Sequence, residues 1–297
     1  MNIEKLAGID IGSNAIRLLV SNAIIERKGR KVSFKKSALV RVPIRLGADS
    51  FLTGKISNEN SDRMIKAMKA FKLLMEVHGV SKFYACATSA MREAENGEAI
   101  IKKIEEESSI KINIIDGKKE ADIIFSTDLS EYIDERKSYL YVDVGGGSTE
   151  FTLFSNGKIV NSKSFKIGTV RLLQNNVESK FIWEDAKEWV KTNTQNLKKV
   201  SLIGSGGNIN KIFKLSGKPL GKPLTIIYLK AYFKFLKQMT YEERITDLGL
   251  NSDRADVIVP ATKIYLNAMK WSGSKKIIVP QIGLADGIIK NLYYSKL

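Results

Sequence analysis

The sequence predicts an α/β protein made of two similar halves, and two observations support this. Two segments, Gly8 to Val20 (GIDIGSNAIRLLV) and Tyr141 to Phe154 (YVDVGGGSTEFTLF), share one pattern: an apolar β-type run with one Asp, a Gly/Ser-rich turn and a second β-type run. Each segment is followed by strand-like and helix-like stretches in alternation. Strands that come first and then alternate with helices are typical of α/β proteins.

The first half opens with a strand hairpin over Ala7 to Ile25 and more β-like sequence up to Leu46. A helix is predicted between Ser57 and Gly79, because its apolar residues follow helical spacing: Met64, Ile65, Ala67, Met68, Phe71, Leu74 and Met75. The elements that follow are a strand (Lys82 to Ala87), a loop with Thr88, Ser89 and Arg92, a helix (Gly97 to Glu107), a strand (Ile110 to Ile115) and a helix from Lys118 to Tyr132.

The second half repeats this order. Predicted in turn are hairpins to Phe165, a helix with Trp183 and Trp189, a strand from Val200 to Ile203, further helices, a last strand from Lys276 to Val279 and a terminal helix. We place the domain boundary near Phe125, which gives domains of residues 1–125 and 126–297, with the terminal helix a candidate to pack back on the first domain.

Composition narrows the class of protein. The 297 residues are 43% hydrophobic and 27% charged, which is typical of a globular protein with a sizeable core. No apolar run approaches the ~20 residues that span a bilayer, and the chain enters a strand pattern without a signal peptide. We therefore expect a cytoplasmic protein without a membrane partner.

Cysteine and histidine are scarce. Cys86 is the single cysteine, so an intrachain disulfide is excluded, and its apolar surroundings (KFYACATSA) favour a core residue over a nucleophile. The one histidine, His78, stands at the end of the predicted helix before Gly79. A histidine triad or multi-histidine metal site is excluded, so acid/base chemistry must come from carboxylates.

The charge balance is strongly basic. The chain has 48 Lys+Arg and 32 Asp+Glu, a formal charge of +16, which favours a polyanionic partner such as nucleic acid or a phosphate polymer. The alternative is that lysines only solvate loops and helix faces, because they are scattered and form no tail; examples are Lys35, Lys36, Lys102, Lys103, Lys198, Lys199, Lys275 and Lys276.

The two Gly/Ser turns are suited to an anion. Glycine-rich turns let backbone N–H groups converge and let a phosphate approach closely; the residues are Gly12, Ser13 and Asn14 in the first turn and Gly145 to Thr149 in the second. Asp10 and Asp143 end the preceding strands, where a carboxylate would repel a phosphate unless a divalent cation lay between them. Ordinary hairpins are the alternative, and the matched pair weighs against it.

Four further residues are candidates for phosphoanhydride chemistry, which needs positioning, charge neutralisation and an activated water. Arg17 and Arg92 could bind phosphate oxygens, with surface salt bridges as the alternative. Glu120, in a first helical turn after a strand, is the candidate base, although acidic residues there also serve the helix dipole. Glu150 stands beside the glycine turn, where we expect it to bind a metal ion or orient water.

Other glycine signals are weaker. The chain lacks the G-x-x-x-x-G-K-[ST] pattern, so a P-loop nucleotidase is not supported. The segment GSGGNINKI at Gly204 to Ile212 reads as a strand, a glycine turn and a helix start, which would bind another phosphate or simply cap the helix.

Taken together, the motifs resemble those of the exopolyphosphatase/guanosine pentaphosphate phosphatase (Ppx/GppA) family. The resemblance runs nearly end to end and in family order: GIDIGSNAIRLLV, ACATSAMREAENG, IIDGKKEADIIF, YVDVGGGSTEF, KIGTVRLL, GSGGNINKI, DRADVIVPA and IGLADGIIKNL. It implies two duplicated ribonuclease H-like domains of the actin, sugar kinase and heat-shock chaperone superfamily around a central cleft. It also implies an enzyme in which water attacks the terminal phosphorus of polyphosphate or guanosine pentaphosphate.

The resemblance assigns roles to residues of this chain. The family's catalytic glutamate matches Glu120, and Asp143 and Glu150 are expected to hold Mg²⁺ and organise the water, with Asp10 a further metal candidate. The phosphate-binding residues it implies are Gly12, Ser13, Asn14, Arg17, Arg92, Gly145, Gly146, Gly147 and Ser148.

The chain also departs from the family pattern. Lys119 replaces the first Glu of the EEA segment, Asp122 the following Arg, and Ala285 and Asp286 stand in a GLREG segment, while Asn208 replaces Thr in the third turn. These changes bear on substrate preference and rate. The chain looks like a short form without the helical C-terminal extension of long members, which favours short polyphosphates or a nucleotide.

Several readings stay open at this stage. The first is a magnesium-dependent exopolyphosphatase; the second is a guanosine pentaphosphate phosphatase that uses the same residues. A third is a polyphosphate or alarmone sensor with little activity. A sugar kinase is disfavoured, because the sequence shows no sugar-pocket signature. Nucleic acid is not the expected partner, and two-domain members of this kind often look dimeric, so a homodimer is an expectation of the resemblance.

Overall fold

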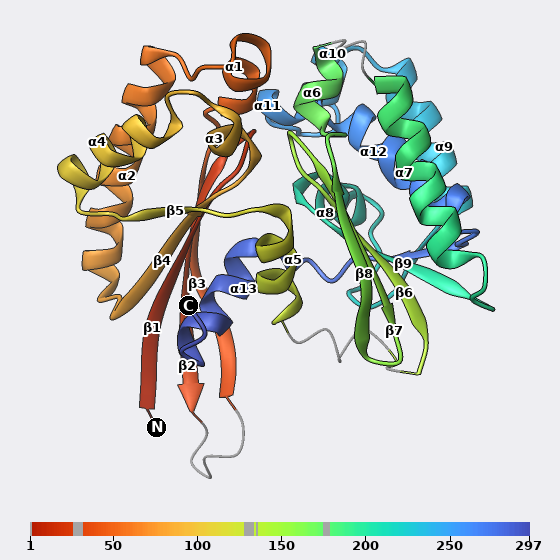
Figure 1. Cartoon of the computed structure of the whole chain (residues 1–297), viewed down its shortest axis with the longest axis horizontal. Coiled ribbons are helices and arrows are strands. Elements are labelled where there is room, and N and C mark those ends of the chain that lie inside the picture. The colour runs from red at the N-terminus through yellow and green to blue at the C-terminus, as the bar shows by residue number, and fades with distance from the viewer. Residues whose placement is uncertain (1, 26–31, 128–133, 135, 175–178) are drawn as a thin grey trace. The chain divides into compact units, whose positions relative to one another are not determined.

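The computed structural model describes residues 2–25, 32–127, 134, 136–174 and 179–297 (Figure 1). The chain forms two compact units. Unit 1 consists of Met1–Thr127 and Gly283–Leu297, and unit 2 of Asp128–Ile282. The terminal segment of the chain therefore belongs to unit 1. That the two halves enclose a cleft stays a prediction.

Unit 1 contains a five-stranded mixed sheet in the order β3-β2-β1-β4-β5. Its strands are β1 (Asn2–Ile11), β2 (Ile16–Ile25), β3 (Val32–Val42), β4 (Lys82–Ala87) and β5 (Ile112–Ile114). The first three are antiparallel, whereas β4 runs parallel to β1 and β5 parallel to β4. The carboxyl ends of β1, β4 and β5 consequently meet at one edge of the sheet.

Helices cover both faces of this sheet. They are α1 (Leu46–Thr53), α2 (Asn58–His78), α3 (Ser89–Glu93), α4 (Gly97–Ser108), α5 (Gly117–Phe125) and α13 (Leu284–Tyr293). Figure 1 shows α2 and α4 side by side on one face, with α5 and α13 on the other. Met64, Met68 and Phe71 of α2 are buried against strand residues such as Ile9 and Leu18.

Two glycines let α13 pack closely on unit 1. A Cβ at Gly287 would lie 2.1 Å from the carbonyl oxygen of Ile123, and a Cβ at Gly8 would lie 2.9 Å from that of Ala285. Asn291 also donates a hydrogen bond of 2.8 Å to the hydroxyl of Ser126. The terminal helix is thus an integral part of unit 1.

Unit 2 contains a six-stranded sheet in the order β10-β11-β9-β6-β7-β8. Its strands are β6 (Ser138–Val144), β7 (Thr149–Ser155), β8 (Lys158–Phe165), β9 (Val200–Ser205), β10 (Leu224–Thr225) and β11 (Lys276–Ile278). The hairpins β6–β7 and β7–β8 are antiparallel, and β9 runs parallel to both β6 and β11.

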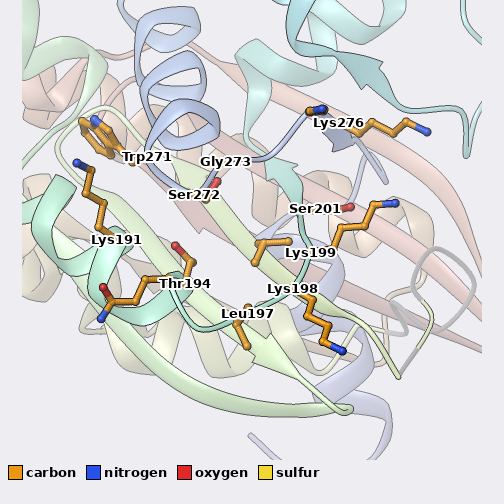
Figure 2. A pocket seen from close by; sticks show the side chains of 13 residues that line it. Lys191, Thr194, Leu197, Lys198, Lys199, Ser201, Trp271, Ser272, Gly273 and Lys276 are labelled. Carbon is orange, nitrogen blue, oxygen red and sulfur yellow. The ribbon is translucent and has the colours of Figure 1, made fainter.

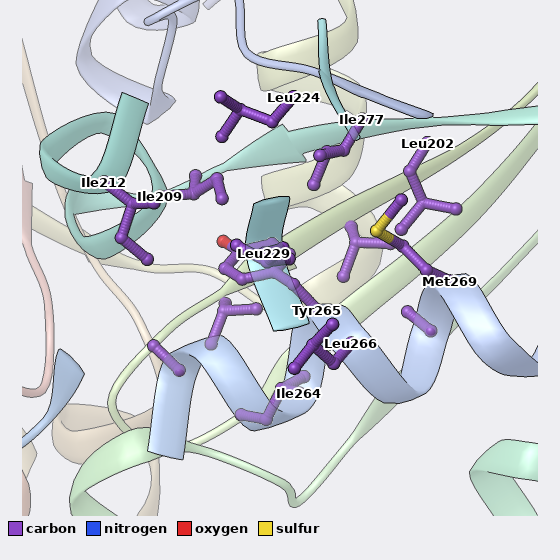
Figure 3. Packing of buried hydrophobic residues seen from close by; sticks show 14 of the residues in the cluster. Leu202, Ile209, Ile212, Leu224, Leu229, Ile264, Tyr265, Leu266, Met269 and Ile277 are labelled. Carbon is purple, nitrogen blue, oxygen red and sulfur yellow. The ribbon is translucent and has the colours of Figure 1, made fainter. Parts of the chain in front are cut away.

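The helices of unit 2 are α6 (Thr169–Leu173), α7 (Ser179–Thr194), α8 (Gly207–Leu215), α9 (Ile226–Gln238), α10 (Tyr241–Thr246), α11 (Ser252–Ala255) and α12 (Ile258–Trp271). Helix α12 is the centre of the packing. Figure 3 shows Tyr265 and Met269 of α12 among apolar side chains that include Leu202 of β9 and Ile277 of β11. All four of these side chains are fully buried.

The structure corrects several sequence-based boundaries. The helix expected from Lys118 to Tyr132 is α5, which ends at Phe125 before the polar residues Ser126 and Thr127; residues 128–133 lie outside the described part. The predicted loop with Thr88, Ser89 and Arg92 contains the short helix α3. Cys86 is a fully buried core residue, as predicted. Within the described residues, no helix combines the length and apolar character needed to cross a membrane.

Candidate active site

The first predicted turn joins β1 to β2 in unit 1. Gly12 donates a backbone hydrogen bond of 3.2 Å to Ala15, which closes the turn. Asp10 and Arg17 face each other across the two strands, and the guanidinium lies 2.9 Å from Oδ2 of Asp10. Asp10 is 5% exposed, whereas the side chain of Arg17 is 33% exposed. Burial raises the pKa of Asp10, and the charge of Arg17 opposes that rise.

Ser13 and Asn14 are held by neighbouring segments. The hydroxyls of Ser13 and Ser89 lie 2.9 Å apart, which links the turn to α3. The carbonyl oxygens of Ser13 and Asn14 accept hydrogen bonds from the backbone N–H groups of Gly47 (2.8 Å) and Arg45 (3.0 Å). These hydrogen bonds attach the turn to the start of α1 and so fix its shape.

Arg92 lies on α3, directly after β4. Its guanidinium donates a hydrogen bond of 2.6 Å to the carbonyl oxygen of Ile115. A guanidinium has five N–H donors, so this one bond leaves others able to meet an anion. Ile115 precedes the first residues of α5, and Arg92 therefore connects α3 to the helix that carries Glu120.

Glu120 lies in the first turn of α5, as predicted. Asp116 caps this helix by accepting a hydrogen bond of 2.7 Å from the N–H of Lys119. Glu120 and Asp10 both raise the pKa of the Cys86 thiol through their charges, after burial as the largest cause. Unit 1 thus gathers Asp10, Arg17 and Glu120 near the carboxyl ends of its parallel strands.

The second predicted turn joins β6 to β7 in unit 2, where Asp143 faces Glu150 across the hairpin. The hydroxyl of Ser205 lies 3.1 Å from Oδ2 of Asp143. Gly206, with φ of 112°, follows at the end of β9, and a Cβ there would lie 2.9 Å from the carbonyl oxygen of Val144. The third glycine turn of the sequence therefore packs directly against the strand end that carries Asp143.

Glu150 is 4% exposed, and two hydroxyls hold it. Ser148 donates a hydrogen bond of 2.6 Å and Ser164 one of 2.8 Å, both to Oε1 of Glu150. The hydroxyl proton of Ser148 is therefore engaged by Glu150. Ser164 was not among the predicted site residues; its register pairing with Glu150 across β7 and β8 reveals it.

The glycine turn is also held from behind by α6. The carbonyl oxygens of Gly145 and Gly146 accept backbone hydrogen bonds from Thr169 (3.0 Å) and Val170 (2.9 Å). The guanidinium of Arg171 donates another, of 3.0 Å, to the carbonyl oxygen of Gly147. These contacts occupy the carbonyl side of the turn. The sequence flagged this segment only as the family-like motif KIGTVRLL.

A model described as the Ppx/GppA phosphatase family matches residues 25–295. The chain belongs to the Ppx/GppA phosphatase family. This membership confirms the resemblance read from the motifs, and with it the expected enzyme class, a phosphoanhydride hydrolase.

Curated relatives of this Ppx/GppA family chain include two kinds of protein. The bifunctional 3-dehydroquinate synthase/phosphatase of Fusobacterium nucleatum is 32% identical over 308 residues, which cover 93% of this chain and 44% of that protein. This chain thus spans less than half of that relative. Exopolyphosphatase 1 of Mycobacterium tuberculosis is 23% identical over 305 residues, which cover 96% of this chain and 87% of the relative.

Solved structures share the fold. An exopolyphosphatase from Cytophaga hutchinsonii has a TM-score of 0.85 at 24% identity and covers 98% of both chains. The Ppx/GppA family member of Aquifex aeolicus has a TM-score of 0.77 at 24% identity and covers 99% of both chains. The predicted α/β class, with two units that each contain a mixed sheet, is confirmed, and the chain shares its fold with these Ppx/GppA structures.

The departures from the Ppx/GppA pattern have defined environments. Lys119 and Asp122 are exposed on α5, and Ala285 is buried beside Gly8. Asp286 forms a salt bridge of 2.7 Å with Lys36 and accepts a hydrogen bond of 3.0 Å from the N–H of Gly283, which caps α13. Asp286 therefore has a structural role within unit 1.

The carboxylates fit a magnesium ion in their chemistry. Among the described residues, no three His, Cys, Asp or Glu side chains gather in a ready-made metal site. Mg²⁺ does not need such a cage, because it usually takes one or two carboxylates and completes its shell with phosphate oxygens and water. Asp143 and Glu150, opposite each other in register, meet this need. Asp10 is already neutralised by Arg17, which makes it the weaker candidate of the three.

Proposed function

We propose that this chain releases orthophosphate from the end of inorganic polyphosphate, with short chains as the preferred substrate. The observation that carries the proposal is the pair of Gly/Ser turns, each next to a carboxylate held in register: Asp10 opposite Arg17 and Asp143 opposite Glu150. The names of the curated exopolyphosphatase relatives support the same substrate class.

Phosphate binding is assigned to both turns. In unit 1, Arg17 and Arg92 contribute guanidinium groups that bind phosphate oxygens, and Gly12, Ser13 and Asn14 supply the turn, in which the carbonyls of Ser13 and Asn14 already accept hydrogen bonds. In unit 2, α6 engages the carbonyls of Gly145 to Gly147, and the N–H of Gly145 donates to the carbonyl of Ser148, so the backbone N–H groups of Gly146 and Gly147 are assigned to the ligand. In this proposal both turns act on the same substrate.

Glu120 is assigned the role of general base. It accepts a proton from water while the water oxygen forms a bond to the terminal phosphorus. The bond from that phosphorus to the bridging oxygen breaks, and its electron pair leaves with the shortened chain. The arginines neutralise charge on the transferred group, and Asp143 and Glu150, positioned by Ser205, Ser148 and Ser164, orient the water.

Magnesium is the proposed cofactor. Asp143 and Glu150 would hold it, and when bound it supplies further neutralisation of the phosphate oxygens. Removal of divalent cations with a chelator is expected to abolish orthophosphate release, and restoring Mg²⁺ is expected to recover it.

The decisive experiment replaces Glu120 by Gln. We expect kcat for orthophosphate release from short polyphosphate to fall by about 10²- to 10⁴-fold, with substrate binding largely retained. Glu98→Gln is the matched control, because Glu98 is an exposed glutamate in the first turn of α4 of the same unit. Unchanged turnover in Glu120→Gln would refute the assigned base.

The substrate is decided by parallel assays on short polyphosphate, long polyphosphate and guanosine pentaphosphate, each with and without Mg²⁺. A higher kcat/KM on guanosine pentaphosphate would replace the first proposal by a nucleotide phosphatase that uses the same residues. Tight binding without turnover on all three would instead identify a sensor.

A further inference from the structure

A hollow of ≈ 690 Å³ lies in unit 2, away from the residues assigned to phosphoanhydride chemistry (Figure 2). We call it the lysine pocket, because five lysines line it: Lys191, Lys198, Lys199, Lys275 and Lys276. Figure 2 shows Lys191 and Trp271 on one side of the hollow and Lys199 and Lys276 on the other. Two segments distant in sequence, residues 191–199 and 275–276, therefore contribute cations to one site.

The sheet explains where this pocket lies. Lys198 and Lys199 directly precede β9, whereas Ser205 ends the strand and Gly206 follows it, both beside Asp143. At about 3.3 Å per residue, the strand separates the two ends by about 17 Å. β11 pairs with β9 only from Leu202 onward, so Val200 and Ser201, which line the hollow, lie beyond the paired part of β11.

The lining has one sign of charge. All five lysines are exposed, no Asp or Glu lines the pocket, and among the described residues none of the five forms an ion pair. Lys191 lies in the last turn of α7, where a cation also stabilises the helix dipole. The other four lie outside helices and have no such role. Several unpaired ammonium groups around one hollow repel each other, and a bound polyanion relieves that repulsion.

The pocket offers charge but little that would read a nucleotide base. Trp271 is its one aromatic residue and already packs edge-on against Trp183, with ring centroids 5.8 Å apart. The hydroxyls of Thr194 and Ser272 donate to carbonyls of their own helices, at 2.7 Å each. Sites for single-stranded nucleic acid combine positive charge with aromatic side chains on which bases stack. A site with lysine ammonium groups and no aromatic surface for base stacking favours a ligand composed only of phosphate groups.

We propose that the lysine pocket binds condensed inorganic phosphate at a second site that takes no part in hydrolysis. The inference rests on residues separate from the proposed catalytic groups. It stands or falls independently of the hydrolytic activity.

Lysine footprinting tests the proposal on the unmodified chain. The protein is treated with an amine-acetylating reagent in EDTA, with and without inorganic tripolyphosphate, and each lysine is quantified by mass spectrometry. We expect acetylation of Lys198, Lys199, Lys275 and Lys276 to fall several-fold at concentrations that leave Lys230 and Lys234 on α9 unchanged. Equal protection of all exposed lysines, or none in the pocket, would overturn the proposal.

A pair of double variants provides a second test by titration calorimetry with tripolyphosphate in EDTA. Lys198→Ala/Lys199→Ala is expected to weaken the pocket's binding event about tenfold, since two screened ion pairs are lost. Lys230→Ala/Lys234→Ala removes the same charge from an exposed helix face and should leave affinity unchanged. Equal weakening in both variants would mean that net charge alone attracts the ligand.

Ligand class is tested by the same footprint with orthophosphate, ATP and a single-stranded RNA of matched charge. Tripolyphosphate should protect the pocket lysines at the lowest concentration. Protection by RNA below the concentration needed for tripolyphosphate would assign the pocket to nucleic acid and refute the proposal. Throughout, kcat of Lys198→Ala/Lys199→Ala on saturating substrate should equal that of the unmodified chain.

Discussion

Asp10 and Arg17 face each other at the mouth of the first glycine turn, 2.9 Å apart, one almost fully buried and the other one-third exposed. Under the proposed function, a phosphate approaches the turn beside this carboxylate and guanidinium. The first consequence of the pair is for stability, because a buried carboxylate depends on the cation beside it.

Replacing Arg17 by Met should lower the free energy of unfolding by about 2 kcal/mol, because the charge of Asp10 is left buried without its partner. The loss should be smaller when Asp10→Asn is added. Urea titrations of the two single variants and the double variant measure this coupling. The matched control is the exposed pair Lys69–Glu107 at 2.7 Å, whose coupling should be much smaller because solvent screens it. Equal couplings in the two pairs would contradict the role of burial.

The hydrogen bonds of Asp49 should make the stability of the fold depend on pH. Oδ2 of Asp49 accepts hydrogen bonds from the N–H (2.9 Å) and hydroxyl (2.6 Å) of Ser57 and from the side-chain amide of Asn60 (2.8 Å). Partial burial raises the pKa of Asp49, but these hydrogen bonds outweigh it and lower the pKa overall. Unfolding therefore takes up a proton at acidic pH, so this contribution is present above pH ~4 and is lost as pH falls through the folded-state pKa.

Asp49→Asn tests this linkage. At pH 7 the variant should be about 1 kcal/mol less stable, a small value because solvent screens a partly exposed group. The difference should shrink as the pH is lowered below ~4, in urea titrations at several pH values. Asp62→Asn, at a residue with a long 3.8 Å ion pair to Lys103, is the control and should change little. A constant difference for Asp49→Asn across this range would rule out the linkage.

Alanine substitutions at Gly206 and Gly217 distinguish the effect of steric crowding from the effect of backbone strain. Both glycines have positive φ, but a Cβ at Gly206 would meet the carbonyl of Val144 at 2.9 Å, whereas nothing lies within 4 Å at Gly217. Gly217→Ala should cost about 1 kcal/mol of stability with kcat unchanged. Gly206→Ala should cost more, and because Gly206 packs beside Asp143 it should also reduce kcat. Thermal unfolding and orthophosphate release measure the two effects; equal behaviour of both variants would contradict the close packing.

The thiol of Cys86 should be unreactive towards alkylating reagents in the native protein. Cys86 is fully buried, and burial raises the pKa of its thiol well above the ordinary value, with Asp10 and Glu120 adding to the rise. Because the thiolate is the reactive form, iodoacetamide at pH 8 should leave the native protein unlabelled and label it in concentrated urea. Mass spectrometry provides the measurement. Rapid labelling of the native chain would show that β4 opens locally.

The sequence predicts local features of this fold well. The helix between Ser57 and Gly79 is α2, because its periodicity, Ser57 cap and Gly79 stop all agree. The two hairpins with their aspartates are strands, turns and strands as expected. These features depend on residues close together in the chain, where spacing and turn chemistry carry the information.

Contacts between distant segments escape such an analysis. Helix α6 has five residues, too few for a periodic pattern, and the carbonyls of Gly145 and Gly146 help to hold it. Ser164 reaches Glu150 only through the register of β7 and β8. Lys198 and Lys276 read as scattered surface charges until the pairing of β9 and β11 brings their segments into one pocket.

Helix α13 also dictates an order of assembly. It supplies part of unit 1 through the contact of Gly287 with Ile123, yet the whole of unit 2 lies between them in the chain. During synthesis, every element of unit 2 leaves the ribosome before α13 does. The nascent chain can therefore complete unit 2 while the surface of β1 that α13 will cover still faces solvent. Unit 1, although most of it is synthesised first, finishes folding after unit 2.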